Sequence, residues 1–301
     1  MNKNYEKFAA VYDAIMDDSL YDKWTDFSLR HFPTDKKKLL ELACGTGIQS
    51  VRFAKAGFDV TGLDLSEDML EIARKRAKAA SEAIEFKQGN MLDLSQAGKY
   101  DLVTCYSDSI CYMADEVEVG DVFKQVYDCL NEDGLFIFDV HSTYQTDTVF
   151  PGYSYHENAE EFAMVWDTYA DEAPHSVVHE LTFFLQDEDG RFTRYDEVHE
   201  ERTYEVLTYD ILLEQAGFKS FKLYADFEDK SHAKSQTAGS LCARSRGSVF
   251  KYVESVFYAS IYVNFYYSSS RIFSFKKFFI NKFKGIPRLY YSFFLLIVMI
   301  L

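Results

Sequence analysis

The chain has 301 residues, of which 48% are hydrophobic and 27% charged, so it can bury the core of one large domain or of two smaller ones. Its net charge of −16 is unevenly divided: residues 1–230 hold 22 Lys and Arg against 47 Asp and Glu, whereas residues 231–301 hold 10 against one. Because binding to a phosphate backbone depends on Lys and Arg, the acidic body disfavours nucleic acid as a partner and favours a small-molecule substrate.

Two helices are predicted at the start of the chain. Apolar residues recur at helical spacing over residues 4–16, and a second helix is expected from about Tyr21 to His31. These helices either form a layer packed on the domain or form a lid in which Tyr12 covers a bound cofactor. Both interpretations are open at this point.

Short apolar strands and amphipathic helices then alternate along the chain. Strands are expected at 39–42, 58–63, 84–87, 101–106 and 135–140, with helices at 47–55, 67–77 and 119–130. This alternation predicts an α/β fold with a doubly wound, Rossmann-like, mostly parallel sheet. In such sheets ligands bind beyond the carboxyl ends of the strands, and several polar or small residues fall there. They are Gly45, Asp64, Asn90, Cys105 and His141.

An antiparallel β insertion is predicted after the fifth strand, over residues 142–205. The segments with strand composition are 163–167, 176–185 and 191–195. Asp189-Gly190 fits a hairpin turn between the last two of them. The insertion is strongly acidic, with three Lys and Arg against 16 Asp and Glu. A helix at 207–215 and a sixth strand at 218–227 then return the chain to the sheet.

The C-terminal tail, residues 231–301, is basic and aromatic and contains no Asp. No helical or strand period persists in it long enough to define a domain. Its last residues, 289–301, are apolar but too few for the roughly 20 that span a bilayer. Three interpretations are open: an out-of-frame or otherwise altered C-terminus, a membrane-associating tail, or a genuine structural extension.

The five cysteines are odd in number and widely spaced, and none forms a C-x-x-C pair. This pattern indicates neither a metal site nor a disulfide framework, and free thiols suit a reducing cytoplasm. The N-terminus lacks the apolar core of a signal peptide, which also favours a cytoplasmic location.

The glycine turn after the first strand is the principal motif. Gly45 and Gly47 let the backbone approach a ligand closely, and the following helix directs its free N–H groups at that ligand. A dinucleotide fingerprint needs a third glycine where the chain has Ser50, which disfavours an NAD site without excluding it. Asp64, 17 residues after Gly47, can accept hydrogen bonds from both hydroxyls of a ribose, which suits an adenosine ligand.

In order and spacing, these motifs resemble those of the class I S-adenosylmethionine-dependent methyltransferases. The resemblance begins with Leu-Glu-Leu-Ala-Cys-Gly-Thr-Gly at 40–47 and covers about residues 4–228. The other matching segments are 60–66, 88–91, 100–109 and 134–140. The chain looks most similar to small bacterial members with a β insertion, and the tail does not match.

The resemblance implies that the chain binds S-adenosylmethionine and releases S-adenosylhomocysteine. In the family, the two glycines approach the methionine moiety, and the acidic residue at the position of Asp64 binds the ribose. The position of Asn90 is usually occupied by an acidic residue that faces the adenine amino group. An amide oxygen can still accept that hydrogen bond. The implied cofactor-binding residues are Tyr12, Glu41, Ala43, Gly45, Gly47, Asp64, Leu65, Asn90, Met91 and Cys105.

Methyl transfer needs little chemistry from the protein, because the sulfonium already activates the methyl group and in-line positioning can supply much of the rate. A general base is required only for a poorly nucleophilic acceptor, and the candidates are Asp108, His141 and His199, for each of which a structural role is also open. The sequence predicts an enzyme that methylates a small molecule it does not identify. Two alternatives stay open: an NAD-type oxidoreductase on a similar sheet, and a protein that binds S-adenosylmethionine without transferring its methyl group.

The family's sheet also has a seventh, antiparallel strand that lies between strands five and six. Residues 1–230, the predicted methyltransferase domain, contain no candidate for it after Phe227. Either part of the tail, such as 249–253 or 260–265, fills this position, or strand five loses a neighbour. A missing neighbour would leave unpaired backbone groups, so we expect low stability or aggregation of this chain.

Overall fold

The computed structural model of the chain describes Asp13 and residues 18–35, 37–187, 189–219, 221–225, 227, 242–243 and 253–258. All of them belong to the first of two units, residues 1–259 and 260–301. The helix predicted over 4–16 lies outside the described residues apart from Asp13, which is helical. Tyr12 and most of the tail also lie outside them.

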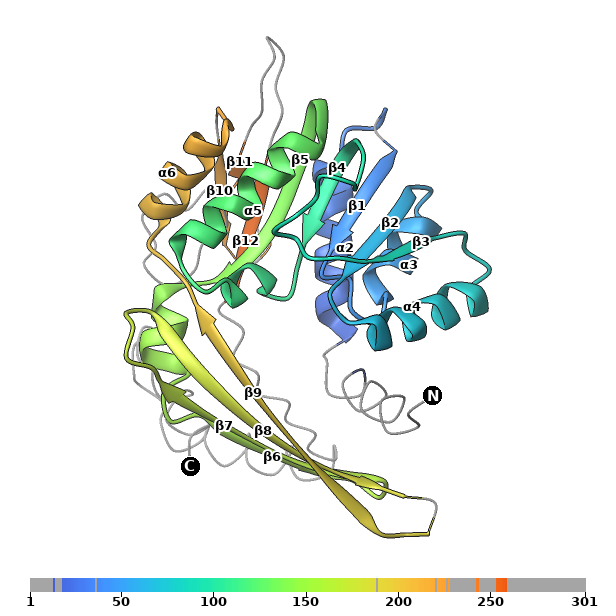
Figure 1. The fold of residues 1–301 in the computed structure, drawn as a ribbon, viewed down its shortest axis with the longest axis vertical. Helices are drawn as coiled ribbons and strands as arrows, with labels where there is room; N and C mark the ends of the chain where they lie inside the picture. Colours follow the sequence, from blue (N-terminus) through green and yellow to red (C-terminus); the bar gives the residue numbers. More distant parts are fainter. Residues whose placement is uncertain are drawn as a thin grey trace, which may run out of the picture. The chain divides into compact units, whose positions relative to one another are not determined.

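The main sheet pairs its principal strands in parallel, as the alternation of strands and helices predicts. These strands are β1 (Lys38–Leu42), β2 (Asp59–Asp64), β3 (Glu85–Gln88), β4 (Tyr100–Cys105), β5 (Leu130–His141), β10 (Lys222–Ala225) and β12 (Val253–Tyr258). Their order is β10-β12-β5-β4-β1-β2-β3, and Figure 1 shows β1 inside the sheet between β4 and β2. The strand order reverses between β1 and β4, which is the point where ligands bind in doubly wound sheets.

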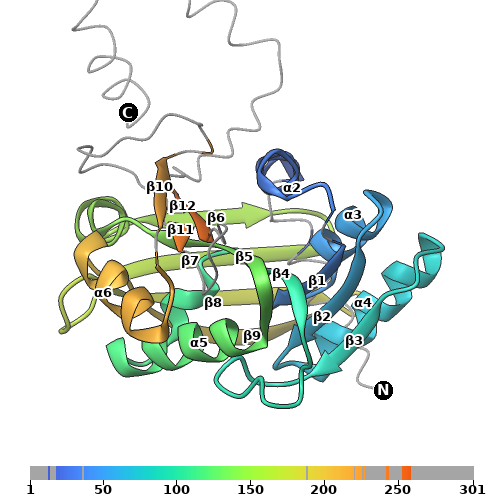
Figure 2. The same cartoon turned by 90° about the horizontal axis from the view of Figure 1, so that it is seen from above.

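Helices cover both faces of this sheet, so its central strands are apolar on both sides. Figure 2 shows α2 (Asp18–His31), α3 (Ile48–Lys55) and α4 (Glu67–Ala79) on one face, and α5 (Glu116–Cys129) and α6 (Val206–Ala216) on the other. α4 begins after its N-cap Ser66, whose hydroxyl accepts from the Met69 N–H at 3.3 Å. Two single-turn helices, η1 (Ser109–Tyr112) and η2 (Gln145–Val149), follow β4 and β5.

The insertion forms a separate antiparallel sheet that starts beyond the end of β5 (Figure 1). Its strands, in order across the sheet, are β6 (Ser154–Asn158), β7 (Phe162–Ala170), β8 (Ser176–Gln186) and β9 (Phe192–Arg202). The predicted hairpin turn is present, with Gly190 at φ +82°. β6 was not predicted, and β9 continues well past residue 195. Opposed residues share a face, so the pairing of Thr168 with His179 and of His179 with His199 places these side chains on one face.

Part of the tail pairs with the main sheet. β12 lies between β5 and β10 and is parallel to both, with Val253 opposite Phe136 and Glu254 opposite Lys222. This is the position that the resemblance predicted for a seventh strand, but the antiparallel orientation predicted for it is wrong. A two-residue strand, β11 (Cys242–Ala243), pairs antiparallel with β5. Strand five therefore has partners from beyond residue 230.

The predicted α/β architecture is confirmed, and the predicted strands and helices among the described residues are present with shifts at their ends. The sequence did not predict β6, β11, η1 or η2, and β12 overlaps the tail candidate 249–253 only at Val253. One difference lies in β5, which begins at Leu130 rather than at Leu135. Residues 131–134, between the predicted helix and the predicted strand, form an irregular part of β5, with Asp133 at φ +59°.

Candidate active site

The glycine turn follows β1, and every second residue in it has a left-handed backbone conformation. Ala43, Gly45 and Gly47 have φ values of +51°, +51° and +75°. At Gly47, a Cβ would lie 2.8 Å from the Cβ of Ala73 and 3.2 Å from Cζ of Phe86. At Gly45, nothing lies within 4 Å of the position that a Cβ would occupy. Gly47 therefore permits close packing of the turn against α4, whereas Gly45 borders open space.

The Asp64 carboxylate faces this turn from the end of β2. Its Oδ2 accepts a hydrogen bond from the Gly45 N–H at 2.7 Å, and its Oδ1 accepts one from the Ser66 N–H at 2.8 Å. These bonds hold the carboxylate at the carboxyl edge of the sheet. The structure thus brings together two of the predicted cofactor-binding residues, Gly45 and Asp64.

Glu41 is a buried carboxyl group on β1. Its side chain accepts a hydrogen bond from the hydroxyl of Ser50 in α3. Burial raises the pKa of Glu41 to about 8; the Ser50 hydrogen bond opposes this rise, and the charge of Asp64 adds to it. Ser50 occupies the position of the third glycine in a dinucleotide fingerprint, and its side chain is fully buried against β1.

The predicted adenine-side residues lie in the loops after β2 and β3. Leu65 follows Asp64 and is 69% exposed, which is unusual for a large apolar side chain. Asn90 is exposed, and its Oδ1 accepts from the Leu92 N–H at 3.0 Å, so the side chain already stabilises its own loop. Met91 is half-buried against the core.

Cys105, at the end of β4, lies between two groups of carboxylates. Burial raises the pKa of its thiol well above the usual value, and so do the charges of Asp139, Glu41, Asp108 and Asp64. Glu41 and Asp64 belong to the surroundings of the glycine turn, whereas Asp108 and Asp139 lie at the ends of β4 and β5. The acidic site is therefore continuous from the turn to these strand ends.

Arg76 of α4 contacts both the glycine turn and Asp13. Its Nε donates to the Thr46 carbonyl at 2.9 Å, and its guanidinium forms an ion pair with Asp13. The Thr46 hydroxyl also donates to Asp13 at 2.7 Å. Asp13 is thus held against the turn by two residues.

Asp139 is a fully buried carboxyl on β5 that supports the loop after β4. It accepts hydrogen bonds from the Trp24 indole at 2.8 Å and from the Asp108 N–H at 3.0 Å. Burial raises the pKa of Asp139 to about 7, and these hydrogen bonds oppose the rise. Ser107 and Asp108 have φ values of +59° and +56°, a costly conformation for residues other than glycine. Asp139 therefore stabilises the strained loop that presents Asp108.

His141 ends β5 between two carboxyl groups. Its Nδ1 lies 3.3 Å from Oδ1 of Asp108, and its Nε2 lies 3.0 Å from Oε2 of Glu201 on β9. Burial raises the pKa of Asp108 well above its usual value, and the charges of Asp139 and Glu201 raise it further. For Glu201, burial acts in the same direction but is outweighed by His141 and His179, which hold the pKa below its usual range.

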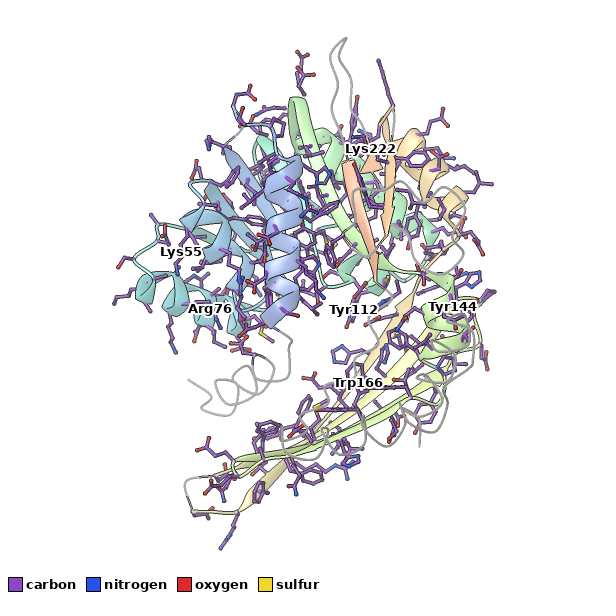
Figure 3. All side chains as sticks on the ribbon, turned by 180° about the vertical axis from the view of Figure 1, so that it is seen from behind. Lys55, Arg76, Tyr112, Tyr144, Trp166 and Lys222 are labelled. Carbon is purple, nitrogen blue, oxygen red and sulfur yellow. The ribbon has the colours of Figure 1, made fainter. Side chains whose placement is uncertain are left out.

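His179 of β8 is oriented from within the antiparallel sheet. Its Nδ1 accepts from the Trp166 indole N–H at 3.1 Å and lies 2.9 Å from the Thr168 hydroxyl. Because an indole N–H only donates, the ring proton of His179 belongs on Nε2. That nitrogen lies 3.7 Å from the same Glu201 oxygen that His141 approaches. A chain of polar contacts thus runs from Trp166, labelled on the antiparallel sheet in Figure 3, to His141.

His199 lies apart from this chain. Its Nδ1 is 3.3 Å from the Tyr112 hydroxyl, and its Nε2 is 2.9 Å from Glu197. Figure 3 labels Tyr112 at the end of the main sheet. Of the three predicted candidates for a general base, the structure brings Asp108 and His141 together and places His199 elsewhere.

Sequence reasoning missed Glu201, His179 and Asp139. The two-residue period of β8 and β9 could have placed His179, His199 and Glu201 on one face once the hairpin turn had set the register. Asp139 had a signal too, because a carboxyl within the apolar run of β5 needs partners when it is buried.

Among the described residues, no group of three or more His, Cys, Asp or Glu is arranged to hold a metal ion. In the same part of the chain, no helix is both long and apolar enough to cross a bilayer. Cys44, Cys105, Cys111 and Cys129 are buried and free.

Comparison with known proteins gives consistent matches. Residues 39–134 match a family model described as a methyltransferase domain. A protein of Geobacillus sp. (strain WCH70) named "Putative methyltransferase GWCH70_2453" is 44% identical over 231 residues, which cover 75% of this chain and 94% of that protein. The crystal structure of an S-adenosylmethionine-dependent methyltransferase from Clostridium acetobutylicum ATCC 824 has a TM-score of 0.67 and 28% identity, and the match covers 76% of this chain and 94% of that one.

A shorter match concerns a protein whose name specifies its substrate. The dTDP-3-amino-3,4,6-trideoxy-alpha-D-glucopyranose N,N-dimethyltransferase of Streptomyces venezuelae is 33% identical over 105 residues, or 35% of this chain and 43% of that protein.

These matches decide which class of activity the chain has. The chain is an enzyme, its cofactor is S-adenosylmethionine, and the NAD-type alternative is set aside. The parallel sheet with its antiparallel insertion agrees with this result. The chain belongs to the class I S-adenosylmethionine-dependent methyltransferases.

Proposed function

We propose that this methyltransferase acts on a small molecule whose reacting atom lies beside His141. The supporting observation is the setting of that ring: Nε2 is 3.0 Å from Oε2 of Glu201 and Nδ1 is 3.3 Å from Oδ1 of Asp108, and among the described residues neither Nδ1 nor either carboxyl oxygen has a hydrogen-bond partner. Glu201 is the closer of the two carboxyl groups and favours the tautomer with its proton on Nε2 and its lone pair on Nδ1. The amino-sugar substrate in the name of the Streptomyces relative supports the choice of a small molecule.

The contacts around the glycine turn support a position for the cofactor. We place the methionine part against Gly45, which borders open space, and the ribose against the Asp64 carboxylate. The exposed Leu65 and Asn90 then flank the adenine, and Glu41 lies toward the methionine end. The remaining members of the proposed set are Ala43, Gly47, Met91 and Cys105. The role of Tyr12 stays a prediction, because this residue lies outside the described ones.

Two tasks then fall to the protein: it must place the acceptor in line and remove its proton. When bound, S-adenosylmethionine supplies a methyl group activated on a positively charged sulfur. His141 accepts the acceptor's proton at Nδ1, and Glu201 stabilises the imidazolium that forms, in the manner of a carboxylate that orients a catalytic histidine. The antiparallel sheet thus contributes to the site through Glu201.

A labelling experiment tests the proposal. The full chain is incubated with methyl-labelled S-adenosylmethionine and a pooled bacterial metabolite extract, and label is expected in the small-molecule fraction. His141→Gln should slow the transfer by about 10²- to 10⁴-fold, the range for loss of a general base, while S-adenosylhomocysteine still binds in calorimetry. The exposed His156→Gln is the matched control. Unchanged transfer by His141→Gln, or label found only on macromolecules, would refute the proposal.

We also propose that residues 1–230 form the methyltransferase domain, with the insertion 142–205 as a roof over the acceptor, in a reducing cytoplasm. The pairing of β12 with β5 implies that the domain also uses part of the tail. A chain ending at residue 230 should unfold at a lower urea concentration than the full chain, because β5 loses backbone partners. Equal midpoints would show that the tail contributes nothing to the sheet.

A further inference from the structure

A buried carboxyl oxygen and a buried imidazole nitrogen face each other beside the proposed acceptor position. Nδ1 of His141 and Oδ1 of Asp108 are 3.3 Å apart, and neither has a hydrogen-bond partner in the described part of the chain. The His141 side chain is 9% exposed and the Asp108 side chain 16%. A buried polar group without a hydrogen-bond partner destabilises the folded protein. A ligand that donates a hydrogen bond to both atoms is therefore favoured over one that donates to a single atom.

We propose that the methyl acceptor is an amine whose nitrogen donates one hydrogen bond to Asp108 Oδ1 and another to His141 Nδ1. The inference rests on the proposed function and names its substrate class. An ammonium group derived from a primary or secondary amine has at least two N–H donors, so one nitrogen can reach both atoms. A hydroxyl has a single donor and a carboxylate has none, so neither can satisfy the pair.

The charges around Asp108 also favour a cation. The charged groups that act on its carboxyl are Asp139 and Glu201, both acidic. In the described residues, the ion pairs of Asp108 and Glu201 are with histidines only. Burial and the two neighbouring carboxylates raise the pKa of Asp108, and an ammonium at hydrogen-bond distance would favour its ionised form. An anionic acceptor would instead be repelled by the same groups.

The backbone around Asp108 is arranged to present this carboxyl. The strained left-handed residues Ser107 and Asp108 are held by the hydrogen bond from the Asp108 N–H to Asp139, which Trp24 in turn supports. Strain of this kind persists only where surrounding contacts fix it, and it concentrates at functional sites. The position of Asp108 is thus maintained by groups that do not contact the acceptor.

The proposed step balances in atoms and electrons. The ammonium gives one proton to His141 Nδ1, which leaves a neutral amine with a lone pair. That nitrogen forms a bond to the methyl carbon while the carbon–sulfur bond breaks, and the electron pair of the broken bond goes to sulfur. The products are a methylated ammonium, which can still donate to Asp108, and the neutral thioether S-adenosylhomocysteine. The proton on His141 passes to solvent when the products leave.

Isotope coupling identifies the methylated atom directly. The full chain is incubated with S-adenosylmethionine carrying a ¹³C methyl group and with pooled extracts of bacteria grown on ¹⁵N. A new methyl signal with one-bond coupling to ¹⁵N in NMR is the expected result. New methyl signals without that coupling would overturn the amine inference and leave the proposed methyltransferase function standing. No new methyl signal from a chain that binds S-adenosylhomocysteine would overturn both.

A matched pair of variants tests the role of Asp108. Asp108→Asn removes the anionic oxygen, and we expect kcat/KM for the amine to fall by at least about 10²-fold, within the range for sites left with an unpaired polar group. Asp121→Asn removes an exposed carboxylate from α5 and should leave kcat/KM unchanged. Calorimetry with S-adenosylhomocysteine shows whether Asp108→Asn is folded. A folded Asp108→Asn variant with wild-type kcat/KM would overturn the inference.

Discussion

Alanine substitutions at Gly47 and Gly45 separate the stability of the glycine turn from its role in cofactor binding. Both residues have left-handed backbones, which cost a non-glycine residue about 1–3 kcal/mol. Only at Gly47 does the new Cβ collide with the protein, at 2.8 Å from Ala73 and 3.2 Å from Phe86. Overpacking of this kind costs a further ~1–3 kcal/mol, so Gly47→Ala should lose about 2–6 kcal/mol in total. That is a large share of the roughly 5–15 kcal/mol that stabilises a typical domain.

Gly45→Ala should behave in the opposite way. Its Cβ meets nothing within 4 Å, so the stability cost is limited to the backbone strain. The open space beside Gly45 is where we place the methionine part of the cofactor, and overpacking there by about 1–3 kcal/mol weakens binding roughly 5- to 150-fold.

Urea unfolding followed by tryptophan fluorescence gives the free energy of unfolding of each variant, and calorimetric titration gives the Kd for S-adenosylhomocysteine. Gly47→Ala should show the larger loss of stability, and Gly45→Ala should lose binding while most of its stability is kept. Equal stability losses in the two variants would refute the packing argument. Wild-type binding by Gly45→Ala would refute the cofactor placement.

Three further predictions concern charged residues. Glu201→Gln should lower kcat by up to about 10⁴-fold, because an amide no longer favours the reactive tautomer of His141, and it should change the S-adenosylhomocysteine affinity little. An unchanged kcat would show that Glu201 has a structural role only. Because burial raises the pKa of Glu41 to about 8, this group is mostly protonated at pH 7, and binding of the cationic cofactor should release a proton. Calorimetry in buffers of different ionisation enthalpy should detect that release in wild type and not in Glu41→Gln, whereas buffer-independent wild-type binding would contradict it. Arg76→Met should raise the Kd for S-adenosylhomocysteine by about tenfold, or 1.4 kcal/mol, by releasing Asp13 from the glycine turn. Arg74→Met serves as the control, because Arg74 pairs with Glu67 and donates to the Phe86 carbonyl and has no contact with Asp13 among the described interactions; equal affinities of the two variants would argue against this link.

Local chemistry accounts for the parts of the fold that the sequence predicts correctly. Ser66 is an N-cap in the structure because its hydroxyl accepts from Met69, and Gly190 allows the hairpin turn because it adopts a left-handed backbone. These features depend on neighbours in the chain, so one sequence suffices to infer them. The parallel orientation of β12 depends on its pairing with β5 and β10, of which β5 lies far away in sequence, and no local sequence pattern indicated this orientation.

The site was predictable to the same extent. Gly45 and Asp64 follow adjacent parallel strands, so their contact could be expected from strand order alone. The approach of Glu201 to His141 requires the main sheet and the insertion to be docked together, which a sequence period cannot show. His199 was among the candidates from the sequence and His179 was missed, although the two residues lie opposite each other on neighbouring strands.

A crystal structure of the full chain with S-adenosylhomocysteine is the most direct test of the proposed site. We expect the ribose hydroxyls within hydrogen-bond distance, about 3 Å, of the Asp64 carboxylate, and the sulfur directed toward the space beside Nδ1 of His141 and Oδ1 of Asp108. A sulfur atom directed away from His141, or separated from it by packed side chains, would contradict the placement of methyl transfer at the ends of β4 and β5.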